Sequence, residues 1–185
     1  MKQSELDQLD DVLEQHALWL DSKGKKGAMA DLNDAELNGA DLQDANLFDA
    51  TMMGAELNGA ILSGANLGKV DLRNAIMYDA DLSKADLSKA NLYQATLSGA
   101  DLSGANLDGA DLEAANLVDA DLSNADLSNA DLTKADLRGA KMTGAKMSGA
   151  KMTGANLDGA IGLEESIVSR KLLEARIRRA IKRIL

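Results

Sequence analysis

Residues able to perform catalysis are few in this chain of 185 residues, and they do not cluster in the sequence. There is one histidine, His16, and there is no cysteine, so a thiolate nucleophile and a Cys/His zinc site are excluded. Aspartate and serine are abundant but evenly spread, whereas general acid–base catalysis needs a pocket that perturbs a pKa. The sequence therefore predicts no enzyme, no catalytic residue and no bound cofactor, and it assigns His16 a structural role.

Two further segments have compositions that bind metal ions or phosphate groups in other proteins. Met142, Met147 and Met152 recur every five residues, but we expect their side chains to point inward from different faces of a core, where they cannot converge on a soft metal ion. Residues 21–27, DSKGKKG, contain three lysines without the GxxxxGK[ST] spacing of a phosphate-binding loop. The sequence therefore predicts no metal site, and this segment is interpreted as a polar hinge.

Most of the chain is a short repeat. From residue 30 to residue 159 the pattern Ala-Asp/Asn-Leu-x-x occurs 26 times in one register, and Val70 is the one exception to Ala at the first place. Places one and three are two residues apart, so in an extended segment both side chains point inward and place two points outward. Place five is Gly in 12 repeats and Asp or Asn in eight, the residues that best tolerate a positive φ. Each repeat is therefore predicted to be an extended piece and a corner, and neighbours must stack to bury their apolar side chains.

This repeat resembles that of the pentapeptide-repeat family over about 70% of the chain. The resemblance implies an all-β solenoid, a right-handed quadrilateral β-helix with four pentapeptides per coil and about six and a half coils. It also implies a narrow interior filled by Ala, Leu and Met, without a cavity for a ligand. Family members known for fluoroquinolone resistance are understood to act on DNA gyrase by imitating duplex DNA. They resemble this chain also in a C-terminal helix used for dimerisation.

An α-helix is predicted at each end of the solenoid. Apolar residues recur at three- and four-residue steps over 4–21, with either His16 or Ala17 on the apolar side. We assign residues 1–22 to an N-terminal capping helix, 23–29 to the Lys/Gly hinge and 30–160 to the repeat domain. Residues 161–185 contain a basic amphipathic helix that forms a cap, a dimer contact or both. Its apolar side consists of Leu173, Ile177, Ile181 and Ile184.

The formal net charge of −10 is unevenly distributed. Residues 1–29 carry −2, residues 30–140 carry −14 and residues 141–185 carry +6. If a coil has about 20 residues, side chains 20 positions apart stack on one another. Acidic columns then arise from Asp81, Asp101 and Asp121, and from Asp111 and Asp131. A third column consists of Asp86, Asn106 and Asp126. A ring of lysines lies above the last carboxylate of each column, Lys141 above Asp121, Lys146 above Asp126 and Lys151 above Asp131. The lysine ring either compensates the charge of its coil or recruits an acidic partner.

A group of apolar and aromatic residues at outward places, together with one arginine, forms a candidate partner surface. It consists of Met53, Arg73, Ile76, Tyr78 and Tyr93, and the Arg73 guanidinium is expected to lie against the Tyr93 ring. This group surrounds an irregular stretch, residues 68–80, that contains the exceptional Val70. A local break in regularity at the surface favours a contact site, although neutral sequence drift on a robust scaffold would give the same pattern.

Two functions follow from these features. The first is a non-enzymatic structural scaffold or protein–protein interaction module, a rigid acidic rod that binds another protein. The alternative is a DNA mimic that binds a DNA-handling enzyme such as DNA gyrase through its acidic columns. We expect a homodimer through the C-terminal helix and no direct binding of nucleic acid. Membrane binding is not expected, since the basic helix lacks aromatic residues and no segment is apolar enough to span a bilayer. The N-terminus has no apolar signal region, which favours the cytoplasm.

Overall fold

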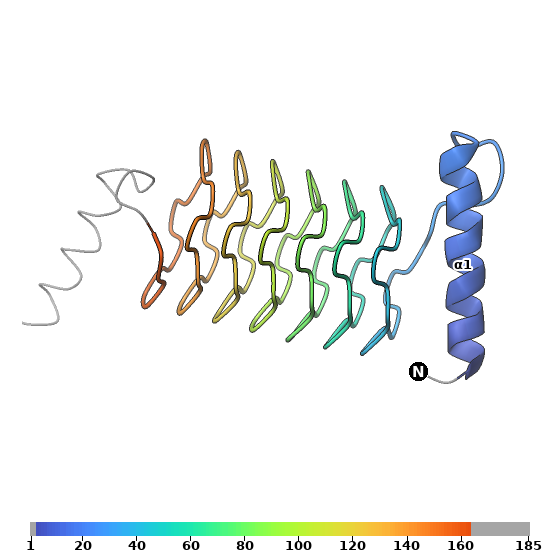
Figure 1. Cartoon of the computed structure of the whole chain (residues 1–185), viewed down its shortest axis with the longest axis horizontal. Coiled ribbons are helices and arrows are strands. Elements are labelled where there is room, and N and C mark those ends of the chain that lie inside the picture. Colours follow the sequence, from blue (N-terminus) through green and yellow to red (C-terminus); the bar gives the residue numbers. More distant parts are fainter. Residues whose placement is uncertain (1–2, 164–185) are drawn as a thin grey trace, which may run out of the picture.

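The structure, a computed structural model, describes residues 3–163 (Figure 1). One α-helix, α1, spans Gln3–Asp21, and a loop joins it to a solenoid of stacked coils. The helix lies across one end of the solenoid, and the opposite end of the described chain is at Leu163. Residues 164–185, where the sequence predicts a basic helix, lie outside the described residues.

The coils are held together by parallel pairing between residues that are 20 positions apart. The β-bridges run from Asp31↔Thr51 to Lys141↔Ile161 without a change of register, so one coil contains four pentapeptides. Each repeat contributes a single bridging residue, its second place, and no longer strand forms within residues 3–163. Pairing continues to Ile161, one residue beyond the boundary expected from the sequence, because its backbone still aligns with Lys141 although the Leu of the repeat is missing.

Backbone hydrogen bonds show why a five-residue unit can stack on itself. The amide of place three donates to the carbonyl of place two in the next coil, as from Leu102 to Asp121 at 2.7 Å. The amide of place five donates to the carbonyl of place four in the next coil, as from Gly104 to Ser123 at 2.9 Å. The amide of place one closes the corner by donating to the preceding third place, as from Ala105 to Leu102 at 3.0 Å. Stacking thus satisfies backbone groups that one coil alone would leave unpaired.

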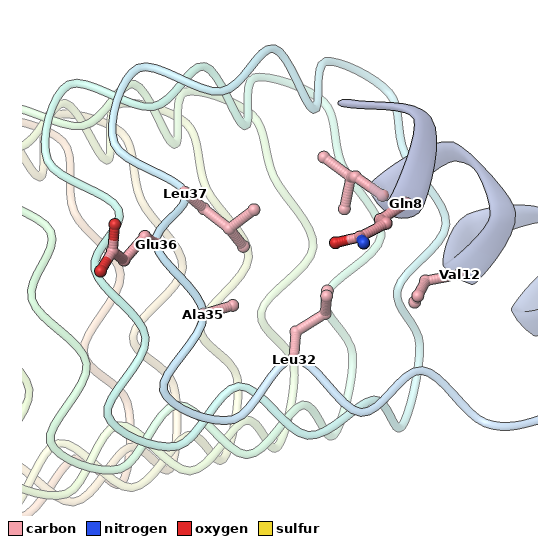
Figure 2. A pocket seen from close by; sticks show the side chains of 7 residues that line it. Gln8, Val12, Leu32, Ala35, Glu36 and Leu37 are labelled. Carbon is pink, nitrogen blue, oxygen red and sulfur yellow. The ribbon is translucent and has the colours of Figure 1, made fainter. Parts of the chain in front are cut away.

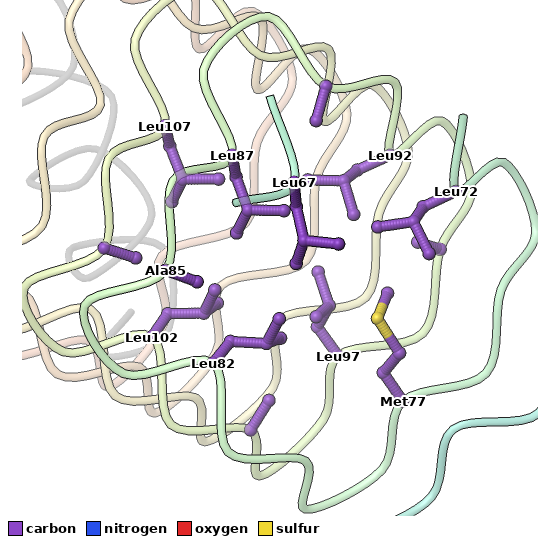
Figure 3. Packing of buried hydrophobic residues seen from close by; sticks show 14 of the residues in the cluster. Leu67, Leu72, Met77, Leu82, Ala85, Leu87, Leu92, Leu97, Leu102 and Leu107 are labelled. Atoms are coloured by element: carbon purple, nitrogen blue, oxygen red, sulfur yellow. The ribbon is translucent and has the colours of Figure 1, made fainter. Parts of the chain in front are cut away.

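Alanine and leucine fill the interior of the solenoid. Figure 3 shows leucines of successive coils lying over one another around the axis, with Met77 in the place of one of them. In the central coils these side chains are fully buried, and Ala85, Leu87 and Leu102 are each 0% exposed. A small residue at place one and a large one at place three fill a narrow tube, so the interior has the close packing of an ordinary protein core.

Every corner has the same backbone conformation. Place five has a positive φ in all 26 repeats, including six in which it is neither Gly, Asn nor Asp. Those six are Lys69, Lys84, Lys89, Gln94, Ala114 and Lys134. A left-handed conformation costs an L-residue about 1–2 kcal/mol, so the repeating architecture, and not the local residue, determines the corner.

Helix α1 contacts the first coil through one side. Leu9 is 6% exposed and His16 is 0% exposed, whereas Ala17 points to solvent, which decides between His16 and Ala17 for the apolar side. The loop after α1 folds back on the helix, and the Ala28 amide donates to the Gln15 carbonyl at 3.1 Å. Within residues 3–163 no helix is long and apolar enough to cross a bilayer.

Candidate functional site

The acidic columns are built from place-two side chains that are anchored to their own repeats. Asp81, Asp101 and Asp121 are successive partners in parallel bridges, so their carboxylates stack along one face. Each Oδ1 accepts the backbone N–H two residues later, over distances of 2.8–2.9 Å. Asp111 and Asp131 do the same for Glu113 and Thr133, both at 3.0 Å. Since the place-four amide has no backbone acceptor in the stacking pattern, the second-place Asp or Asn supplies one.

Hydrogen bonding lowers the pKa of several of these carboxylates although like charges stack. The Ser83 hydroxyl lowers the pKa of Asp81, and the Ser123 hydroxyl is the largest cause that lowers the pKa of Asp121. Thr133 has the same effect on the pKa of Asp131, where Lys151 is the second cause. Sequence reasoning missed this arrangement. Its signal is the recurring Asp-Leu-Ser or Asp-Leu-Thr at places two to four, which is typical of a side chain that caps its own turn.

The lysine ring pairs with the coil beneath it in the register that 20-residue stacking predicts. Lys141 lies 3.3 Å from Asp121, Lys146 lies 3.2 Å from Asp126 and Lys151 lies 3.0 Å from Asp131, measured from Nζ to Oδ2. All three lysine side chains are more than half exposed, so each pair contributes about 0–1 kcal/mol. Within the described residues, Asp81, Asp101 and Asp111 form no ion pair, in contrast to Asp121 and Asp131 of the same columns.

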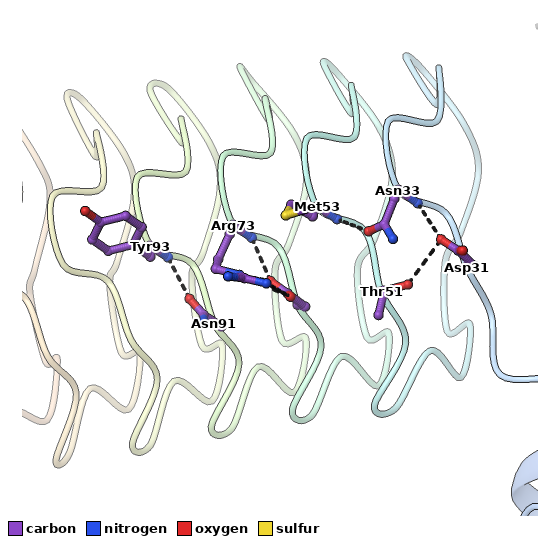
Figure 4. A network of polar contacts seen from close by, with 8 residues as sticks. Asp31, Asn33, Thr51, Met53, Arg73, Asn91 and Tyr93 are labelled. Atoms are coloured by element: carbon purple, nitrogen blue, oxygen red, sulfur yellow. Dashed lines mark hydrogen bonds and ion pairs between the residues drawn. The ribbon is translucent and has the colours of Figure 1, made fainter.

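The candidate partner surface is partly exposed, but its cation is placed differently from the expectation. Figure 4 shows Met53, Arg73 and Tyr93 on successive coils along one edge of the solenoid. The expectation that Arg73 lies against Tyr93 is wrong, because the guanidinium binds Asp71, with Nη2–Oδ2 at 2.7 Å and Nε–Oδ1 at 2.9 Å. Both side chains leave the same side of one repeat, and a forked charged pair is stronger than an exposed cation–π contact.

Ile76 and Tyr78, the other members of this surface, belong to the next repeat and lie around the next corner. Tyr78 is 47% exposed and Met53 is 37% exposed, whereas Ile76 and Tyr93 are half-buried. Ile61, which the sequence analysis did not include, is 39% exposed. Met53 and Tyr78 are thus exposed apolar side chains on neighbouring faces, whereas Ile61 lies one corner beyond Ile76.

The stretch around Val70 is not irregular in the structure. Val70 is 0% exposed, and the bridge from Asp71 to Asn91 keeps the common register. The departure at Gly68 has a packing reason, since a Cβ there would lie 3.0 Å from the Phe48 ring. The Lys69 ammonium then lies 5.1 Å from the centroid of the Phe48 ring. Sequence irregularity here reports local side-chain packing and not a distorted backbone.

A cleft of about 450 Å³ lies between α1 and the first coil (Figure 2). The helix contributes Gln8, Leu9 and Val12, and the coil contributes Leu32, Glu36 and Leu37. Glu36 is the one titratable lining residue, which gives no pair of groups for acid–base catalysis. Among residues 3–163 there is also no cluster of three or more His, Cys, Asp or Glu side chains that could hold a metal ion.

The lysine-rich segment 21–27 folds back on itself through hydrogen bonds to Ser22. The Ser22 hydroxyl accepts the backbone amides of Lys25 and Lys26 at 3.1 and 2.8 Å, so these amides do not point at an empty cradle. The predicted hinge is a compact turn in this structure. The residues that the sequence predicts for a dimer contact or cap, Leu173, Ile177, Ile181 and Ile184, lie outside the described residues.

Known proteins with similar structures include several pentapeptide repeat proteins. HetL, a pentapeptide repeat protein involved in heterocyst differentiation regulation in the cyanobacterium Nostoc sp. strain PCC 7120, is 36% identical, with 76% of each chain covered and a TM-score of 0.43. A trypsin-treated form of QnrB1, a plasmid-mediated fluoroquinolone resistance protein, is 23% identical over 70% of this chain and 69% of that one, with a TM-score of 0.46. Rfr23, a pentapeptide repeat protein from the cyanobacterium Cyanothece 51142, is 34% identical over 57% and 63% of the two chains, with a TM-score of 0.31.

Among proteins with curated functions, none matches this sequence. Pentapeptide repeat proteins form right-handed quadrilateral β-helices, and they are generally structural or interaction proteins. The family model for pentapeptide repeats matches in eight copies, which extend from residue 30 to residue 159. That range is the one in which the parallel bridges and the buried Ala and Leu positions recur. The chain belongs to the family of pentapeptide repeat proteins.

Proposed function

We propose that this protein is a non-enzymatic docking rod that binds another protein through its outer surface. The observation that supports this most directly is the filled interior, in which the inward side chains of the central coils are 0–1% exposed. A core without a cavity offers no enclosed site for a substrate, so recognition falls to the outside of the rod. There, rigid coils hold the side chains at fixed spacings, which lowers the conformational cost of binding.

The docking surface proposed here is the patch made by Met53, Ile76, Tyr78 and Tyr93, with Arg73 beside it. Aromatic and Met side chains are enriched at the centres of protein interfaces, and Arg73 is already held by Asp71. Tyr78 is the anchor we favour because its ring is the most exposed of the four.

A binding assay on Tyr78→Ala tests this surface. Partners captured by the full-length chain from lysate of the source organism are identified first, and the affinity of the recovered partner is then measured for each variant. Tyr78→Ala is expected to weaken binding at least tenfold, about 1.4 kcal/mol or more. Leu18→Ala is the matched control, because Leu18 is also 47% exposed but lies on α1. Equal affinities of the wild type and of Tyr78→Ala, Tyr93→Ala and Ile76→Ala would remove this patch from the proposal.

The alternative function is imitation of DNA toward a DNA-handling enzyme such as DNA gyrase. The observation in its favour is the stack of Asp81, Asp101 and Asp121, whose carboxylates follow one another at the spacing of adjacent coils, about 4.8 Å. Asp81 and Asp101, which form no ion pair among the described residues, leave negative charge in a regular array, and such an array presents a phosphate-like potential to a surface built for duplex DNA. QnrB1, which shares the fold, is a fluoroquinolone resistance protein.

Replacing charge without changing geometry separates the two functions. Asn keeps the Oδ1 acceptor of each anchored carboxylate, so the five-fold variant with Asp81, Asp101, Asp111, Asp121 and Asp131 changed to Asn removes the columns and keeps the turns. Its matched control carries Asp34, Asp44, Asp49, Asp79 and Asp119 changed to Asn, five exposed corner residues at positive φ.

DNA mimicry predicts that the wild type inhibits gyrase supercoiling or protects gyrase from a quinolone. It also predicts that the column variant loses this effect, that the corner variant keeps it and that added salt weakens it steeply. If the wild type leaves supercoiling and quinolone sensitivity unchanged over a wide concentration range, gyrase is not the target.

We also propose that the protein is a homodimer through residues 164–185, whose apolar positions repeat at helical spacing. Light scattering compares the full chain with a chain that ends at residue 163. We expect two chains per particle for the full chain and one for the truncated chain. The same number of chains per particle in both proteins would overturn the dimer.

A further inference from the structure

The single histidine of the chain holds α1 on the end of the solenoid. His16 Nδ1 accepts the backbone N–H of Ala30, the first residue of the first repeat, at 3.0 Å. The side chain is 0% exposed, and Nε2 has no hydrogen-bond partner although it is buried. The imidazole stacks on Trp19, with ring centroids 5.8 Å apart and an interplanar angle of 11°. This hydrogen bond therefore joins the last turns of α1 to the start of the repeat.

Only the neutral imidazole fits this environment. An acceptor at Nδ1 requires an unprotonated nitrogen there, whereas the imidazolium carries N–H donors on both nitrogens. Protonation would place an Nδ1–H donor against the Ala30 N–H donor and would leave a charge in a buried site. The contact that fixes α1 to the first coil thus changes from attractive to repulsive when one proton is added.

The groups around the ring determine where that proton binds. Burial is the largest influence and lowers the pKa of His16, while the Phe48 backbone and the Asp49 carboxylate, both on the first coil, raise it by a smaller amount. On α1 the neighbouring ring is that of Trp19, which is uncharged. The net direction is downward from the ordinary value of about 6.5, so the ring is neutral at pH 7.

Releasing α1 would uncover the end of the solenoid. In the stacking pattern the place-two amide donates to the preceding coil, and the first coil has none before it. Beneath the helix, Leu32 and Leu37 are 7% and 3% exposed, and they belong to one hydrophobic cluster with Leu9 of α1. We propose that His16 is a pH-sensitive latch, and that its protonation detaches α1 from the first coil while the coils behind it stay folded. This inference does not depend on the proposed function.

Trp19 reports on the latch without any label, because it is the one tryptophan of the full chain. Its fluorescence is followed on the full-length protein from about pH 7.5 to about pH 5, above the range in which the carboxylates titrate. A change in emission with a midpoint below about pH 6.5 is expected. By hydrogen exchange, the protection factor of the Ala30 amide should fall with the same midpoint, while that of the Leu102 amide in the central coils stays constant.

Two variants assign the transition to His16. His16→Asn offers Oδ1 as an acceptor near the position of Nδ1 but does not titrate, so its Trp19 emission should be constant over this pH range. Asp49→Asn removes a charge that favours the imidazolium and should lower the midpoint, whereas Asp79→Asn, an equivalent corner residue, should not change it.

Three results would overturn the latch. The first is Trp19 emission and Ala30 protection that are both constant in the wild type. The second is a transition that persists in His16→Asn. The third is a loss of Leu102 protection together with that of Ala30, which would mean that the whole solenoid unfolds. The wild-type exchange measurement decides the question even if a variant does not fold.

Discussion

The corner residues allow a stability prediction in which equivalent positions respond with opposite signs. Ala114 and Gly59 both occupy place five, with φ values of 57° and 61°. We predict that Ala114→Gly raises the free energy of unfolding and that Gly59→Ala lowers it. The two changes exchange the same pair of residues in the same backbone conformation, so that conformation should determine both signs.

The magnitude follows from two opposing contributions. A left-handed conformation costs an L-residue about 1–2 kcal/mol, which Ala114→Gly removes. The greater conformational freedom of Gly in the unfolded chain lowers the free energy of unfolding by about 0.5–1 kcal/mol. The expected net gain is about 0.5–1 kcal/mol, with a loss of similar size at Gly59, where an added Cβ would meet no atom within 4 Å.

Urea denaturation followed by circular dichroism measures both effects, provided that the m-value is unchanged between variants. Ala105→Gly is the control, because Ala105 is fully buried and does not have a positive φ, so Gly there should be destabilising. Stabilisation by Gly at both Ala105 and Ala114 would point to a general effect of Gly. Destabilisation by Ala114→Gly would refute the reasoning from backbone strain.

Three further predictions concern the core, the anchored carboxylates and pH. Leu102→Ala should lower the free energy of unfolding by about 2–5 kcal/mol in thermal or urea denaturation, because Leu102 is fully buried between coils, and a loss below 1 kcal/mol would contradict tight packing. Asp101→Ala should cost about 1 kcal/mol more than Asp101→Asn, since only Asn keeps an acceptor for the Ser103 amide, and equal stabilities would argue against this role. The pKa of Asp81, Asp121 and Asp131 is lowered in the folded protein, so on acidification the unfolded chain takes up protons first. The stability that these groups contribute is therefore present above about pH 4 and is lost as the pH falls through their folded-state pKa values. Acid titration at a fixed urea concentration should show this loss, and a stability that rises on acidification would refute it.

The five-residue period allowed much of the fold to be predicted before the structure. The period placed Ala and Leu inside. The family resemblance added the coil of 20 residues, and together they predicted that Lys146 lies above Asp126. These features are predictable because a strict repeat has one register, and each place in it has one environment. The apolar side of α1 was predictable only up to the choice between His16 and Ala17, because both follow Leu13 at a helical step, of three and of four residues.

The candidate site was less predictable because it depends on rotamers and not on register. Arg73 could reach either Asp71 or the Tyr93 ring from its place in the sequence, and the competition between a charged fork and an aromatic face decided the outcome. The residues at Gly68 and Val70 suggested an irregular surface, whereas the Phe48 ring of the preceding coil explains Gly68. Contacts between coils join residues 20 positions apart, so no local pattern contains them.

The sequence by itself determined the unit, a corner every five residues and an inward Ala and Leu, because side-chain alternation and the tolerance of positive φ are local properties of the chain. Tertiary structure alone decided two contacts that local patterns left open: the Asp71 fork in place of the Arg73–Tyr93 contact, and the buried contact of His16 with Ala30. The physical reason is that charge, burial and hydrogen bonding depend on distances in space, and the stacking of coils and the docking of α1 set those distances.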